Sequence, residues 1–170
     1  MTTDEPTWLT AEQLRTWRAL HAATVVLPVA LDAQLQRDAQ ISYLEYYALA
    51  GLSERPDHTA RLSDLAILTG AELSRISHLI ARLEKRGLVI RRPDPDDGRY
   101  TNAILTEQGW EKVKQAAPAH VATVRTLLFD GLNANGLREL NRTADRIVAA
   151  LRATDLPIAP TIRKALYQTE

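Results

Sequence analysis

The 170-residue sequence contains no cysteine. This absence excludes disulfide bonds, thiolate nucleophiles, zinc fingers and thiol-based redox sensing. Glycine occurs only 7 times, and aromatic residues make up 5% of the chain. Alanine, leucine, arginine and glutamate are abundant instead, and these side chains lose little rotamer freedom in a helix. The composition therefore predicts a mainly α-helical fold.

Long apolar runs are also missing. The chain has no stretch of about 18 uninterrupted apolar residues, which a membrane-spanning helix would need. Its first residues do not combine a basic segment with an apolar one, as a secretory signal would. We therefore expect a soluble, cytoplasmic protein with no membrane partner. An apolar fraction of 45% over this length is typical of one globular domain, so residues 1–170 are interpreted as a single domain.

The residues that catalysis or metal binding would need are not arranged for either. The acidic pair Asp96 and Asp97 falls in a turn without a partner base, and the chain has neither a nucleophile elbow nor a Gly-rich phosphate loop. The 4 histidines are not spaced as paired ligands on a helix, and no cysteine accompanies them. The sequence therefore predicts no enzyme, no metal site and no cofactor.

The outer parts of the chain show the apolar periodicity of long helices. Thr10 with Gln13, and Ser42 with Glu45, have the spacing of capping boxes. Pro28 is expected to kink or break the first helix, because proline removes a backbone hydrogen bond. A bend is expected where Pro118 falls in a later helix. The expected elements are helices over 10–37, 42–51, 106–129 and 137–151, a loop over 53–59 and a tail over 153–170.

Residues 59–105 have a different pattern. A short helix over 62–69 is expected to be capped by Ser63 and ended by Gly70 in a left-handed conformation. The next helix, over 73–86, is expected to bury one side, made of Leu73, Ile76, Leu79, Ile80 and Leu83. Strands over 88–90 and 100–105 then flank a stretch of turn-forming residues. Two short helices and a hairpin in this order predict a winged helix-turn-helix.

Local charge supports nucleic-acid binding by this module, although the formal net charge of the chain is zero. Between positions 73 and 92 there are six basic residues and a single acid, Glu84. A basic stripe on one helix is most often only a solvated face. Because a basic hairpin follows this one directly, double-stranded DNA is the predicted partner.

The polar residues of the helix over 73–86 are expected to have different roles, according to their position along it. Ser74, Arg75, Ser77 and His78 lie in the first two turns, where hydroxyl groups and one guanidinium can reach base edges. Arg82 and Lys85 come later and are expected to meet phosphates. In the hairpin, Arg91 and Arg92 extend the basic surface. Arg99 is expected to enter the minor groove, oriented by Asp97.

The central sequence resembles the MarR family of transcriptional regulators. The stretches LSDLAILTG, SRISHLIARLEKRGLVIRR and DPDDGRYTNAILTEQG carry the resemblance, which extends more weakly over about residues 10–152. It implies a homodimer whose dimerisation helices are 10–52 and 106–152, with a winged helix-turn-helix over 59–105. It also implies a repressor of a pseudo-palindromic operator that a small ligand releases. Glu72 departs from the family pattern, which often has serine at that position.

Five residues are predicted to line a pocket for an aromatic or phenolic effector, because amphipathic aromatic side chains suit such ligands: Trp17, His21, Tyr43, Tyr46 and Tyr47. Packing in a dimer core explains them equally well. Two alternative functions also remain open. The winged helix could be a protein-interaction module that docks an acidic partner, or the chain could be an activator or a regulator without a ligand.

Overall fold

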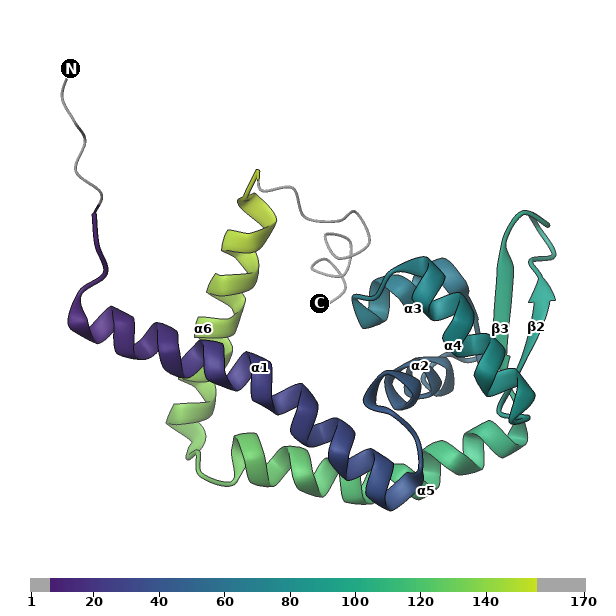
Figure 1. Ribbon diagram of the computed structural model, residues 1–170, viewed down its shortest axis with the longest axis horizontal. Helices are drawn as coiled ribbons and strands as arrows, with labels where there is room; N and C mark the ends of the chain where they lie inside the picture. Colours follow the sequence, from purple (N-terminus) through teal and green to yellow (C-terminus); the bar gives the residue numbers. More distant parts are fainter. Residues whose placement is uncertain (1–6, 156–170) are drawn as a thin grey trace.

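A computed structural model describes residues 7–155 of the chain. Most of the predicted C-terminal tail therefore lies outside the described residues. The described part is mainly helical with one small antiparallel sheet, as predicted (Figure 1). Its elements in chain order are α1 Ala11–Ala39, α2 Tyr43–Ser53, β1 Thr59–Arg61, α3 Leu62–Thr69, α4 Leu73–Lys85, β2 Val89–Pro93, β3 Thr101–Leu105, α5 Glu107–Val124, the π-helical segment η1 Arg125–Phe129 and α6 Ala134–Ala153.

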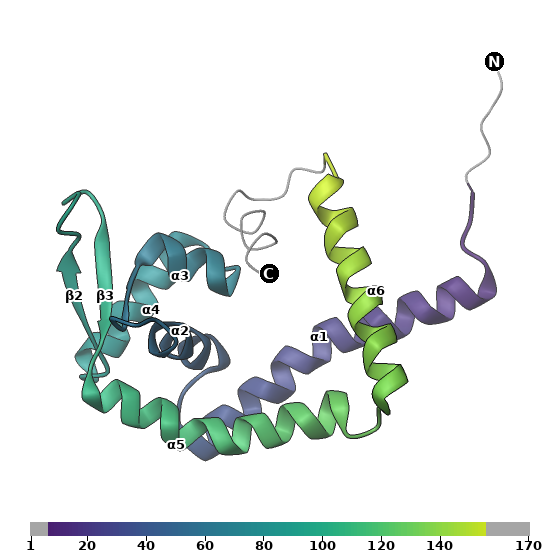
Figure 2. The same cartoon turned by 180° about the vertical axis from the view of Figure 1, so that it is seen from behind.

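The elements form two regions. Helices α2, α3 and α4 and the sheet gather into a winged helix-turn-helix at one side (Figures 1 and 2). The helices α1 and α5 run together beneath this module and away from it, and α6 crosses α1 at the far side in both views. No helix within residues 7–155 is both long enough and apolar enough to cross a membrane.

The first helix begins as predicted and ends later. Thr10 and Gln13 form the expected capping box, and Gln40 ends α1 in a left-handed conformation with φ 54°. The helix does not break at Pro28, contrary to one expectation. Its C-terminal half packs on α2 and α5, and this packing holds the helical path despite the backbone hydrogen bond that proline cannot make.

Helix α2 has the predicted capping box, formed by Ser42 and Glu45, but it continues past Gly51 to Ser53. The prediction that Gly51 ends the helix is wrong. A Cβ at this position would collide with the side chain of Leu68 in α3. Gly51 therefore allows α2 and α3 to approach closely. In the sequence alone, a glycine with this packing role looks the same as a glycine that ends a helix.

The sheet has a strand that the sequence analysis did not predict. Strand β1 is only three residues long and pairs antiparallel with β3, which places Ala60 opposite Ala103. The strand order is β1-β3-β2, so β3 lies in the centre. Strands β2 and β3 form the predicted hairpin, with Val89 opposite Leu105. Three residues are too few for an alternating pattern to show in the sequence.

Two details of the helix-turn-helix differ from the predictions. Arg61, not Ser63, occupies the N-cap position of α3, and no side chain caps that helix. Gly70 ends it with φ 63°, as expected. In α4, the predicted apolar side is buried at Ile76, Leu79, Ile80 and Leu83. Leu73 is 49% exposed instead of buried, because α4 starts at this residue, at the edge of the core.

The C-terminal helices also begin and end differently from expectation. Helix α5 begins at the expected place, with Thr106 as its side-chain cap, and it continues through Pro118 until η1 follows it. Helix α6 starts at Ala134 because the Asn133 side chain accepts hydrogen bonds from the backbone N–H groups of Asn135 and Gly136. Gly136 therefore lies inside α6, which begins three residues before the expected start at 137.

Candidate nucleic-acid interface

The polar side of α4 is free of the core along its whole length. Ser74, Arg75, His78, Arg82 and Lys85 are exposed, and Ser77 is half-buried. The structure therefore brings all six predicted recognition-helix residues to one surface. Side chains three or four residues apart lie on the same side of a helix. Because the buried aliphatic residues of α4 hold one side of the helix in the core, the polar residues are left on the opposite side.

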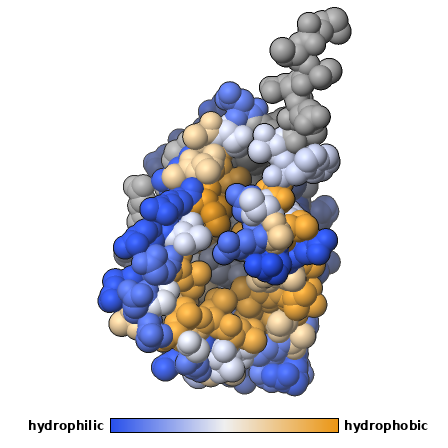
Figure 3. Space-filling view, turned by 90° about the vertical axis from the view of Figure 1, so that its left-hand side faces the viewer, coloured by the Kyte–Doolittle hydropathy of each residue, from blue (hydrophilic) through white to orange (hydrophobic). Residues whose placement is uncertain are grey.

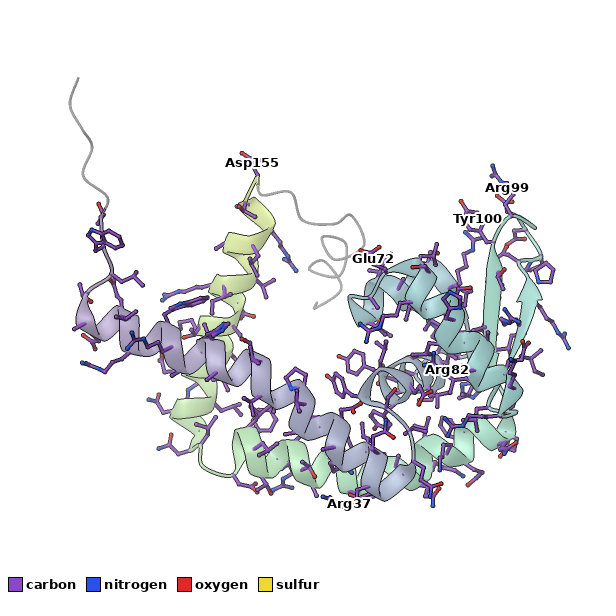
Figure 4. The ribbon with its side chains drawn as sticks, in the orientation of Figure 1. Arg37, Glu72, Arg82, Arg99, Tyr100 and Asp155 are labelled. Atoms are coloured by element: carbon purple, nitrogen blue, oxygen red, sulfur yellow. The ribbon has the colours of Figure 1, made fainter. Side chains whose placement is uncertain are left out.

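The start of α4 lacks a side-chain cap. Glu72 occupies the N-cap position, but its carboxylate accepts no hydrogen bond from the first turn. In Figure 4, Glu72 lies along the same edge of the winged module as Arg99 and Tyr100 at the tip of the hairpin. The N-terminal end of α4 and the wing therefore reach toward the same side of the molecule, and the uncapped N–H groups are left for solvent or a ligand.

The C-terminal end of α4 is tied to α2. The buried carboxylate of Glu45 lies 3.7 Å from Arg82 Nη2 and 3.5 Å from Arg86 Nη1. Arg86 also donates from Nη2 to the carbonyl oxygen of Gln40 at 3.0 Å. Arg86 thus connects α4 to α1 and α2. Arg82 remains 60% exposed at its side chain, so it can still meet an anion in solution.

Arg99 at the wing is held by Asp97, as the sequence analysis supposed. Arg99 donates from Nη2 and Nε to the Asp97 carboxylate at 2.6 and 2.9 Å, and its backbone N–H donates to Oδ1 at 3.1 Å. The side-chain hydrogen bond lowers the pKa of Asp97 below its ordinary value. The Arg99 side chain is 84% exposed. It is therefore oriented by the protein and still available to a partner.

Asp94 is a structural residue of the wing that the sequence analysis missed. Its carboxylate is 6% exposed and receives the guanidinium of Arg61 from the end of β1. Oδ1 also accepts the backbone N–H groups of Asp96 and Asp97, at 3.0 and 3.1 Å. Hydrogen bonding by Arg61, with these backbone donors, lowers the pKa of Asp94 to about 2. The available signal in the sequence was an aspartate as the first residue of a turn, where its side chain can accept hydrogen bonds from backbone N–H groups two or three residues later.

The other two basic residues of the wing, Arg91 and Arg92, differ in whether the protein itself binds their side chains. Arg91 donates from Nε to Glu84 Oε2 at 2.7 Å, and its backbone N–H donates to Oε1 at 2.9 Å. These bonds connect β2 to α4 and lower the pKa of Glu84. Arg92 is exposed beside it. Of the two, Arg92 is the freer cation.

The five residues predicted to line an effector pocket fall into two separate groups. Trp17 and His21 stack on α1, with ring centroids 5.6 Å apart, and Trp17 is 54% exposed. Tyr43 and Tyr47 stack on α2, also at 5.6 Å. Tyr46 is buried in the second group. The structure therefore does not bring all five residues to one site.

Tyr46 packs against His120, a buried histidine from α5, with ring centroids 4.5 Å apart. Gln34 donates from Nε2 to Asp38 at 3.0 Å, so its Oε1 is left to accept a hydrogen bond from His120 Nδ1 at 3.2 Å. This arrangement places the proton of the neutral imidazole on Nδ1. Burial lowers the pKa of His120.

A cavity of about 780 Å³ lies between α1, the start of α2 and α4. Of the five predicted effector-pocket residues, Tyr43 is the one that lines it, and α1 contributes Asp32. The helix α4 contributes Arg75, His78 and Arg82. The cavity therefore shares side chains with the surface predicted to bind DNA. No group of three or more potential metal ligands occurs among residues 7–155.

Large apolar side chains remain exposed on the helices away from the winged module. Figure 3 shows apolar surface gathered on the side of the molecule that carries the start of α1 and α6. Helix α6 has no buried residue at all. We call the following residues the terminal apolar face: Leu14, Trp17, Leu20, Val25, Val26 and Val29 from α1, Val121, Leu127, Leu128 and Phe129 from α5 and η1, and Leu137, Leu140, Ile147 and Leu151 from α6.

Comparison with known proteins identifies the family. The MarR family pattern matches residues 41–101, from the start of α2 to the start of β3. The curated repressor MprA of Escherichia coli is 30% identical over 73 residues, which cover 43% of this chain and 42% of MprA. The match thus spans less than half the length of that relative.

Solved structures match over nearly the whole chain. Sco3205, a MarR family transcriptional regulator from Streptomyces coelicolor in complex with DNA, is 41% identical with a TM-score of 0.81, covering 90% of this chain and 95% of that one. AbsC, a MarR family regulator from the same organism, is 36% identical with a TM-score of 0.81, covering 88% of this chain and 100% of that one. The chain therefore belongs to the MarR family of transcriptional regulators.

Proposed function

We propose that this chain is a homodimeric repressor that binds a pseudo-palindromic operator and is released by a small anionic aromatic ligand. The observation that carries the DNA-binding part is the shared edge formed by the start of α4 and the wing, where Arg99 stands oriented by Asp97. That Sco3205, 41% identical over most of its length, is in complex with DNA supports the same function here.

Each part of this surface has a chemical role in the proposal. Arg75 offers a planar fork that matches the O6 and N7 acceptors of guanine in the major groove. Arg82, Lys85 and Arg92 neutralise phosphates and set the position of the protein on the duplex. Arg99 enters the minor groove, and the hydrogen bonds that it donates to Asp97 reduce the rotamer entropy that binding would otherwise cost.

The homodimer is supported by the terminal apolar face. Large apolar patches on a protein surface usually mark an interface, and an amphipathic helix such as α6 must bury its apolar side against something. A second copy of the chain is the occupant that brings a complementary surface with two-fold symmetry. Trp17 and His21 belong to this interface in the proposal, and two winged modules then face successive turns of one operator.

Ligand release is supported by the cavity between α1, α2 and α4. Arg75 and Arg82 supply positive charge at its wall, and Tyr43 supplies an aromatic surface. A carboxylate or phenolate bound there would pair with the arginines that the operator also needs. DNA and ligand would then compete for one set of side chains, which gives repression that the ligand relieves.

Operator selection tests the DNA-binding part of the proposal. Genomic fragments retained by the purified protein should contain a pseudo-palindrome, and footprinting should show two protected half-sites about 10 bp apart from centre to centre. Retention of fragments without a shared motif would contradict sequence-specific binding. Binding to single, unpaired half-sites would contradict the dimer.

Thermal-shift screening tests the effector part. Aromatic carboxylic acids should raise the melting temperature, because a ligand of the folded state stabilises it by mass action. The same acids should release operator DNA, and Arg82→Ala should weaken both effects. Methyl esters of the active acids are the matched control. Equal activity of acid and ester would show that charge pairing with the arginines is not the basis of recognition.

A further inference from the structure

Leu73 differs in chemistry from the exposed polar residues of α4. It is the first residue of the helix and is 49% exposed, while Ser74 and Arg75 follow it directly. Within the described residues, it is the only large apolar side chain of α4 that is exposed. A single exposed leucine is common on protein surfaces and means nothing by itself. Leu73 is distinguished by its position between α4 and the wing.

Leu73 faces the space between the helix and the wing. It lines a hollow of about 210 Å³ together with Ser77 from α4 and with Arg99 and Tyr100 from the wing. The proposed function places α4 in the major groove and Arg99 in the minor groove, so Leu73, which lies between them, meets the same partner. A leucine side chain can neither donate nor accept a hydrogen bond, which rules out a direct bond to a phosphate. The fitting partner is an apolar group on the nucleic acid.

We propose that Leu73 is a specificity-determining residue that reads the C5-methyl group of a thymine in each half-site. The inference rests on the proposed function, because it requires α4 to enter the major groove. There, the thymine methyl is the apolar group that base-pair edges display, and aliphatic side chains contact it. The first residues of a recognition helix are those that reach base edges. Cytosine lacks this methyl group, so Leu73 discriminates against it.

The position of the thymine follows from the order of residues along α4. Leu73 lies at the wing side of the first turn, two residues before Arg75. The methyl of a thymine lies close to the backbone of its own strand, at the margin of the major groove. The thymine that Leu73 reads is therefore on the strand that passes between α4 and the wing, whereas Arg75 lies on the side of α4 that faces α1 and α2.

Replacing thymine with deoxyuridine tests this inference, because it removes the methyl group and leaves every hydrogen-bonding atom in place. Each thymine of one half-site of the selected operator is replaced in turn, and the dissociation constant of the full-length protein is measured. One position should weaken binding about fourfold, the value expected for one buried methyl group. Leu73→Ala should bind thymine and deoxyuridine equally at that position.

Two variants serve as controls. Leu73→Met keeps an aliphatic side chain and should keep the preference for thymine. Ile90→Ala removes a similarly exposed aliphatic group, 42% exposed on β2, and should also leave the preference unchanged. A protein that binds its operator but is indifferent to every deoxyuridine, or a Leu73→Ala variant that still prefers thymine, would overturn the inference and leave the proposed function intact. Failure of the wild-type protein to bind any operator would overturn both.

Discussion

The guanidinium of Arg61 lies against the carboxylate of Asp94, with Nε 2.7 Å from Oδ2 and Nη2 3.1 Å from Oδ1. The pair joins the strand that precedes α3 to the base of the wing, across 33 positions of sequence. The Arg61 guanidinium also lies over the ring of Tyr100, with Cζ 4.7 Å from the ring centroid. Because Asp94 also holds the backbone of Asp97, which orients Arg99, the pair supports the whole wing.

The first prediction concerns this pair. The folded state lowers the pKa of Asp94 to about 2, from an ordinary value of 3.8. A depressed carboxyl pKa stabilises the fold above the ordinary value, and this contribution is lost as the pH falls from about 4 toward about 2. Asp94→Asn should therefore lower the melting temperature at pH 7. The difference from the wild-type protein should shrink on acidification.

Thermal unfolding monitored by circular dichroism between pH 2 and pH 7 measures this effect. Asp96→Asn is the matched control, because Asp96 is exposed and lies two positions along the same turn. Its melting temperature should follow that of the wild-type protein at every pH. Parallel curves for the Asp94 variant and the wild-type protein would show that the carboxylate charge does not hold the wing.

The second prediction concerns His120. Burial lowers its pKa from the ordinary value of 6.5, so protonation favours the unfolded chain, in which the imidazole is solvated. The stability that this histidine contributes is therefore complete above pH 6.5 and declines as the pH falls below it. His120→Asn should reduce the loss of stability between pH 7 and pH 5. His78→Asn, at an exposed position on α4 and outside the proposed dimer interface, should leave that loss unchanged.

The third prediction tests the proposed dimer. Leu140 belongs to the terminal apolar face and is 41% exposed. Leu140→Glu places a charge in the proposed interface, where burial without a partner is costly, so it should shift the protein from dimer to monomer in sedimentation experiments. Ala149→Glu puts the same charge on the opposite side of α6 by helical spacing and should remain dimeric. Sedimentation of both variants as dimers would contradict an interface at α6.

The fourth prediction separates base reading from phosphate binding on α4. Arg75→Ala should cost roughly 1–3 kcal/mol for each half-site of the cognate operator and relax the preference at one base pair in each. Lys85→Ala removes two phosphate contacts from the dimer, so it should weaken binding to all duplexes by a similar factor and lower the salt slope by about two units. Competition titrations with cognate and scrambled duplexes measure both. The roles assigned here are wrong if Lys85→Ala changes sequence preference or Arg75→Ala does not.

The elements that the sequence predicted well are those with local signals. Both capping boxes at the N-terminal end form as predicted, because a hydroxyl and a carboxylate or amide three residues apart satisfy each other within one turn. The polar side of α4 is also exposed as predicted, because four buried aliphatic residues fix the rotation of that helix. The contact between Asp97 and Arg99 is equally local.

The features that the sequence did not predict depend on distant partners. Arg61 and Asp94 lie far apart in sequence, and neither has a local pattern that names the other. Gly51 allows a close approach to Leu68 of another helix, which sequence cannot distinguish from a helix stop. The exposure of Leu73 depends on the three-dimensional packing around the N-terminal end of α4, where this residue lies at the edge of the core. The five aromatic effector candidates separated because residues on α1 and α2 face different neighbours.

The central claim is operator binding through α4 and the wing, and its most direct test is the salt dependence of binding. Fluorescence anisotropy with labelled operator is measured at 50 and 200 mM salt for the wild-type protein and the Arg75→Ala/Arg99→Ala double variant. We predict selective binding by the wild-type protein that weakens about a thousandfold over this range, as expected for about six phosphate contacts in a dimer. We also predict that the double variant loses selectivity. Wild-type binding that is absent, insensitive to salt, or unchanged by both substitutions would contradict the account.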